Sequence, residues 1–140
     1  MSNRELDNLV AVGQLKVEPG VRAEFNGLVD SARKRLADAR NESLAPESRF
    51  DLAYNAAHGF ALAALRQKGY RPENRYVAFQ ALAHTLNLPA AVWRVLAKAH
   101  SDRNRAEYEG RWEVDERLLA DLLSCTAVVE TAVAKLDPPG

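Results

Sequence analysis

The chain of 140 residues has 19 lysine and arginine and 19 aspartate and glutamate residues, so its formal net charge at pH 7 is zero. This balance excludes a protein that coats nucleic acid through an overall basic surface, and any attraction to nucleic acid must come from a local patch. A single cysteine excludes an internal disulfide, and the length predicts one domain with one buried core.

Residues 1–20 are predicted to form a short helix followed by a linker. The segment NRELDNLVAVG has a helical pattern that ends at Gly13, and Pro19 and Gly20 interrupt the linker QLKVEPG. The N-terminus lacks the apolar core of a signal peptide, and no stretch approaches the roughly 18 apolar residues of a membrane span. We therefore expect a soluble, cytoplasmic protein with no membrane partner.

The first two long helices are predicted over residues 21–40 and from about Pro46 to Gly69. Apolar residues in the first recur at steps of three and four, which places them on one face. Ser43 as a cap, or Pro46 in the first turn, opens the second helix, and Gly69 ends it. The second helix is rich in alanine, which permits close approach of its neighbours, so we expect it at the centre.

The remaining elements are also predicted to be helical. A third element covers residues 73–87, with Tyr76 and Phe79 on its apolar face, a fourth helix runs from Pro89 to about Tyr108, and the last covers residues 114–136. No β alternation is found, and residues 137–140 are expected to fray. The sequence predicts an all-α, up-and-down bundle of four long helices plus one or two short helices, formed by residues 21–136.

The fourth helix ends in a charged stretch, AHSDRNRAEYEGRW, that contains the first candidate site. Arg103 follows Val92, Leu96 and Ala99 on one helical face, where an apolar residue is expected. An arginine there must find a partner or reach a cleft, because an unpaired buried charge is costly. Together with Asn104, Arg105 and Tyr108 it provides the charges and hydrogen-bond donors that bind phosphate.

Ion pairing within the protein is the alternative explanation of this charged stretch. Arg103 then pairs with Asp102, Glu107 or a glutamate elsewhere, and basic residues also favour the end of a helix. His100 is the only histidine close enough in sequence to act as a base beside Arg103.

A second group of polar residues, Tyr54, Asn55 and His58, lies in the alanine-rich helix. Asp51 shares one face with Asn55 and His58, so this face either lines a cleft opposite Arg103 or forms an exposed edge or internal network. The group offers too few ligands for a metal, and the chain has no glycine-rich phosphate loop or dinucleotide motif. No metal and no cofactor are therefore expected.

Two segments resemble the HEPN superfamily, small helical bundles of prokaryotic toxin–antitoxin, defence and RNA-processing systems. RFDLAYNAAHGFALAALRQKGYRP (residues 49–72) is similar to the family's second long helix, and RNRAEY (residues 103–108) lies where the family has its Arg-x4-His type of motif. The order of the elements also matches, over roughly residues 21–136. The resemblance implies a homodimer that binds RNA. In active members the arginine and histidine form a metal-independent ribonuclease site, which the polar residue after the arginine, here Asn104, supports.

The chain differs from the motif at the histidine, since Tyr108 stands there and no histidine follows Arg103. Some members pair with a nucleotidyltransferase antitoxin that modifies a tyrosine two residues beyond the histidine, and Gly110 stands at that position. A tyrosine with a pKa near 10 is a poor general base at neutral pH.

Three functions follow as hypotheses. The first is a divergent or non-catalytic HEPN-like module that binds RNA, a nucleotide or a protein partner through Arg103, Asn104, Arg105 and Tyr108, with Tyr54, Asn55 and His58 as further candidate residues. The second is a metal-independent endoribonuclease with an altered site that uses Arg103 and Asn104 with Tyr108, His58 or His100. The third is a helical module that only assembles with a larger partner, its charged stretch being an ion-pair network.

Overall fold

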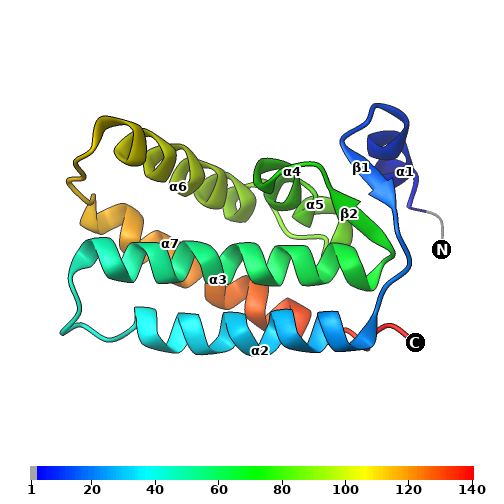
Figure 1. The fold of residues 1–140 in the computed structure, drawn as a ribbon, viewed down its shortest axis with the longest axis horizontal. Coiled ribbons are helices and arrows are strands. Elements are labelled where there is room, and N and C mark those ends of the chain that lie inside the picture. The colour runs from blue at the N-terminus through cyan, green and yellow to red at the C-terminus, as the bar shows by residue number, and fades with distance from the viewer. Residues whose placement is uncertain (1–2) are drawn as a thin grey trace.

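The computed structural model describes residues 3–140 and confirms the predicted all-α bundle (Figure 1). Helix α3 lies at the centre, because it contacts each of the other three long helices, and α2 runs antiparallel beside it. The four long helices are α2 (Arg22–Ala39), α3 (Pro46–Gln67), α6 (Ala90–Glu109) and α7 (Glu116–Val133).

Local signals in the sequence set the ends of these helices. Pro46 occupies the first turn of α3, where its missing N–H costs nothing. The carboxylate of Asp115 accepts the backbone N–H groups of Arg117 and Leu118 at 2.8 and 3.1 Å and so caps α7. Gly110 ends α6 in the left-handed conformation, with φ of 74°.

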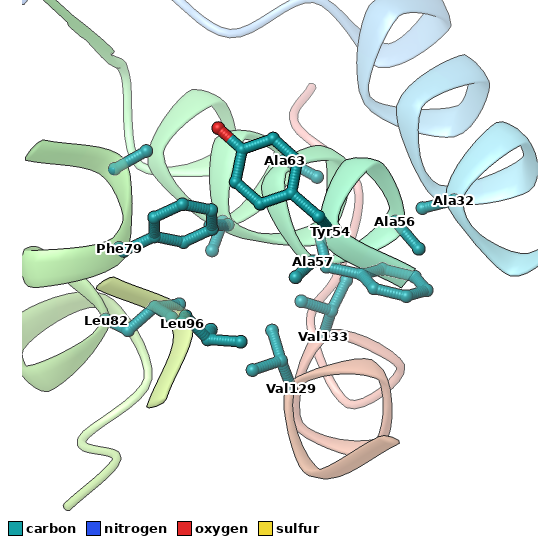
Figure 2. Packing of buried hydrophobic residues seen from close by; sticks show 14 of the residues in the cluster. Ala32, Tyr54, Ala56, Ala57, Ala63, Phe79, Leu82, Leu96, Val129 and Val133 are labelled. Carbon is teal, nitrogen blue, oxygen red and sulfur yellow. The ribbon is translucent and has the colours of Figure 1, made fainter. Parts of the chain in front are cut away.

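The alanines of α3 let its neighbours approach closely, as their small size predicts. Ala56 and Ala57 are fully buried, and Figure 2 shows them among larger side chains from α4 to α7 such as Phe79, Leu96 and Val129. At Gly59 a Cβ atom would lie only 3.1 Å from Cβ of Ala32, so α2 and α3 are in direct contact there. The core therefore surrounds α3 on several sides.

The predicted linker after the first helix is wrong at residues 15–17, which form a strand. Helix α1 (Arg4–Ala11) is followed by β1 (Leu15–Val17), which pairs antiparallel with β2 (Tyr70–Pro72). Each strand has three residues, too few for alternation to show, and the partners are far apart in sequence. The hairpin-like pair attaches the N-terminal segment to the end of α3 (Figure 1).

A buried arginine holds this segment in place. The side chain of Arg66 is 1% exposed and donates to Oε1 of Glu24 at 2.7 Å and to the backbone oxygens of Glu18 and Pro19 at 2.7 and 2.8 Å. Arg71 adds ion pairs to Glu18 and Glu24 at 2.6 and 2.8 Å. The network links α2, α3, β2 and the residue that follows β1.

The predicted third helix is interrupted at Ala81 and forms α4 (Arg75–Gln80) and α5 (Leu82–Thr85). The Asn74 side chain caps α4 by accepting the N–H of Val77 at 3.0 Å. This start places Val77 in the core and leaves Tyr76, a predicted core residue, 42% exposed.

The C-terminal part completes the bundle. Cys125 is half-buried on α7. In the tail after α7, the backbone oxygen of Asp137 accepts a hydrogen bond from Gln67 at 3.2 Å. None of the helices in residues 3–140 is both long and apolar enough to cross a membrane.

Candidate functional site

The candidate site is built around Tyr54, in the middle of α3. Its ring is buried and packs against Phe79 of α4, with centroids 5.9 Å apart. Figure 2 shows its hydroxyl directed away from the aliphatic side chains of Leu96 and Val129. A buried phenol needs a hydrogen-bond partner, and Nδ1 of His100 on α6 provides one at 2.7 Å. The hydroxyl therefore joins α3 to α6 at the edge of the core.

Two arginines from different helices face the same ring. Cζ of Arg75 on α4 lies 5.4 Å from the centroid of Tyr54, and Cζ of Arg103 on α6 lies 5.1 Å from it. Both distances are short enough for cation–π attraction, which places two positive charges beside one buried aromatic residue. Tyr54, Arg75, His100, Arg103 and Asn104 are named the Tyr54 cluster below.

The two arginines differ in how their charge is balanced. Arg103 donates through Nε to Asp51 at 2.6 Å and through Nη1 to Glu107 at 3.5 Å. Arg75 donates to the side-chain oxygen of Asn55 at 3.0 Å and makes no ion pair within residues 3–140. The guanidinium of Arg75 is exposed, so the cluster presents one positive charge to solvent that no carboxylate matches.

Both histidines near the cluster are neutral at pH 7. Burial, followed by the charge of Arg75, lowers the pKa of His58 to about 4. Burial also lowers the pKa of His100, with Arg75 and Arg103 as further causes. The Nδ2 of Asn104 lies 3.2 Å from Nε2 of His100, so both ring nitrogens of His100 have hydrogen-bond partners. The imidazole is therefore held in one orientation.

The structure brings together four of the seven candidate residues. Arg103 and Asn104 lie in the cluster with Tyr54, and Asn55 contacts it through Arg75. His58 is not one of the hydrogen-bonded residues of the cluster. The centroid of its ring lies 6.1 Å from that of Phe79.

The other two candidates of the charged stretch lie outside the cluster. Arg105 is 66% exposed and pairs with Asp102 at 3.5 Å. Tyr108 is 93% exposed, so the structure does not place it with Arg103 and Asn104. The predicted internal pairing of Arg103 is confirmed for Glu107, but the shorter ion pair is to Asp51 of α3.

Arg75 is the residue that sequence reasoning missed. It follows Asn74, whose cap was a readable signal for a helix start at that point. Its contact with Tyr54 depends on the path of the chain from α3 through β2 to α4. No local sequence pattern encodes that path.

The arrangement suits binding of an anion more than binding of a metal. Two guanidinium groups and an amide are donors, which phosphate oxygens accept. Within residues 3–140 no three His, Cys, Asp or Glu side chains come together in a way that could hold a metal ion.

Comparison of the chain with family models, curated proteins and solved structures gave no match in any of the three.

Proposed function

We propose that the protein is a HEPN-like helical module that binds single-stranded RNA by its phosphate groups at the Tyr54 cluster. The observation that supports this most is the convergence of Arg75 and Arg103 on one aromatic ring while Arg75 has no carboxylate partner in the described part of the chain. Each guanidinium group can donate to phosphate oxygens of the strand, and no carboxylate of the described residues balances the charge of Arg75.

RNA is favoured by the resemblance. The formal net charge of zero means that binding must come from a local patch, and the two arginines provide one. Homodimerisation and a toxin–antitoxin or defence role accompany the resemblance and belong to the same proposal.

Binding of fluorescein-labelled decaadenylate, followed by anisotropy, tests the proposal. Arg75→Gln and Arg103→Gln are each expected to weaken binding by about tenfold, since a charged hydrogen bond contributes roughly 1.5–3 kcal/mol. Arg35→Gln is the matched control, because Arg35 is exposed on α2 and its guanidinium contacts only Ser31. An equal loss with all three variants would contradict a specific site.

The ion pair between Arg103 and Asp51 also supports the assembly role. The variants Arg75→Gln and Arg103→Gln distinguish that role from RNA binding. If Arg103→Gln lowers stability while RNA affinity is unchanged in both arginine variants, the cluster serves the fold and the protein is an assembly module.

A metal-independent endoribonuclease is the second candidate function. It is favoured by the hydrogen bond between Tyr54 and the neutral imidazole of His100, which lies one helical turn from Arg103. A 2′-hydroxyl that replaces Asn104 at Nε2 of His100 can give its proton to the neutral imidazole, and the arginines can stabilise the charge that develops on the phosphate. For this candidate we expect the protein to cleave RNA in the presence of EDTA. His100→Gln should abolish the cleavage, and Tyr108→Phe should preserve it.

A further inference from the structure

We infer that a hollow beside the Tyr54 cluster, between Arg103 and Trp112, binds the nucleobase next to the bound phosphate. This inference rests on the proposed function and specifies which part of the ligand lies where. The hollow has a volume of about 380 Å³, within the range of small-molecule sites. Asp51, Arg103, Arg111 and Trp112 are among the residues that line it.

The end of α6 creates this hollow. Gly110 turns the chain in the left-handed conformation, so that Arg111 and Trp112 lie over the last turns of the helix. Ala106 also lines the hollow, and a larger side chain there would reduce the space. The shape therefore depends on one glycine and one alanine in the sequence RAEYEGRW.

Trp112 provides a fixed aromatic surface in the lining of the hollow. Its indole packs edge-on against Phe50 of α3, with centroids 4.7 Å apart and the planes at 79°. The side chain is half-buried, so the core holds one part of it while another part lines the hollow. Bases of single-stranded nucleic acid stack on aromatic side chains held in this way.

The charges of the hollow suit an uncharged base rather than a second phosphate. Its lining has two arginines, Arg103 and Arg111, and two carboxylates, Asp51 and Glu107, which balance. Carboxylate oxygens accept hydrogen bonds from the amino groups of adenine, cytosine and guanine, and uracil has no such group. Adenine is therefore expected to bind better than uracil.

A larger hollow, which shares Ala106, Arg111 and Trp112 with the smaller one, does not fit the same ligand. It has a volume of about 680 Å³, and its carboxylates Asp102, Glu109 and Glu113 outnumber its arginines. A phosphate is repelled there. Arg103 belongs both to the Tyr54 cluster and to the smaller hollow, so a phosphate at the cluster places the adjacent base in the smaller one.

The chain contains only two tryptophans, so Trp93→Phe makes Trp112 the single indole and a direct reporter. Decaadenylate is expected to quench its emission on binding, decauridylate to bind several-fold more weakly, and inorganic tripolyphosphate to compete without quenching. In the same background, Ala106→Met, which fills the hollow, is expected to abolish the quenching while the arginine-dependent binding of tripolyphosphate remains.

Variants of Trp112 complete the test in the original chain. Trp112→Leu is expected to weaken decaadenylate binding by about tenfold, and Trp112→Phe to restore most of it. Circular dichroism confirms that each variant is folded. If decaadenylate binds through Arg75 and Arg103 but neither quenches Trp112 nor responds to Trp112→Leu, the base subsite is refuted and the phosphate site stands. If decaadenylate does not bind at all, both proposals fail.

Discussion

At the scale of single residues, the site depends on charges that are partly withdrawn from water. Tyr54 is buried, yet two guanidinium groups lie over its ring and its hydroxyl contacts His100. Burial is the main reason why the imidazoles of His58 and His100 are neutral, and the charge of Arg75 adds repulsion against their protonated forms. The protonation of the histidines is therefore coupled to the stability of the fold.

The coupling between protonation and stability can be measured at His58. Its pKa is about 4 in the folded state, whereas the ordinary value is 6.5, so between these pH values the unfolded chain binds more protons. The free energy of unfolding should therefore fall as the pH is lowered from 6.5 towards 4, with a contribution from His58 on the order of 3 kcal/mol. Urea denaturation at several pH values in this window, on the original chain and on His58→Phe, measures it.

The phenylalanine variant keeps an aromatic ring beside Phe79 and removes the titration. It is expected to show a weaker dependence on pH, with the remaining part in the same direction from His100, whose pKa is also lowered. Identical pH dependence in the two proteins would show that His58 is not held neutral by the fold.

Residue patterns in the sequence predicted the position of Arg103 but not the residues that it meets in the site. The apolar face of α6 correctly placed Arg103 on the inner side of its helix, where it needs a partner. The partner was not readable, because Asp51 lies on α3 and its distance from Arg103 depends on how the helices pack. Arg75 was missed for the same reason, since its contact with Tyr54 joins two elements that no short motif connects.

At the scale of elements, the long helices were predictable and the short ones less so. A helix predicted over residues 21–40 is observed as α2, Arg22–Ala39, because its apolar face repeats over several turns. The strands β1 and β2 have three residues each and become strands only by pairing with one another. Their position is set by tertiary contacts, chiefly those of Arg66.

Arg66 is expected to be essential for that pairing, whereas Arg71 is not. Arg66→Met leaves the carboxylate of Glu24 and three backbone oxygens, those of Glu18, Pro19 and Tyr70, without their buried donor, which should cost about 3–5 kcal/mol of unfolding free energy. Arg71 binds the same two glutamates but its side chain is 33% exposed, so Arg71→Gln should cost about 1 kcal/mol or less. Urea denaturation of the two variants compares them directly, and equal losses would contradict the structural role of Arg66.

At the scale of the whole molecule, the formal net charge is zero, and the proposed binding site is a small positive region of the surface. Attraction over long distances is then weak, and specificity must come from contacts near the cluster and the hollow beside it. The proposed RNA binding therefore differs from that of basic RNA-binding proteins, in which many phosphates are neutralised at once. The dependence of affinity on salt measures that difference.

The salt dependence of RNA binding should be shallow. If Arg75 and Arg103 together neutralise about two phosphates of a single strand, the logarithm of the association constant should fall with the logarithm of salt concentration with a slope of about −1.4. Anisotropy titrations of decaadenylate over a series of potassium chloride concentrations give this slope. Arg75→Gln should reduce its magnitude by about half, because one of the two phosphate contacts is lost. A slope several times steeper, or one that Arg75→Gln does not change, would mean that RNA binds along another surface, since two arginines cannot release that many counterions.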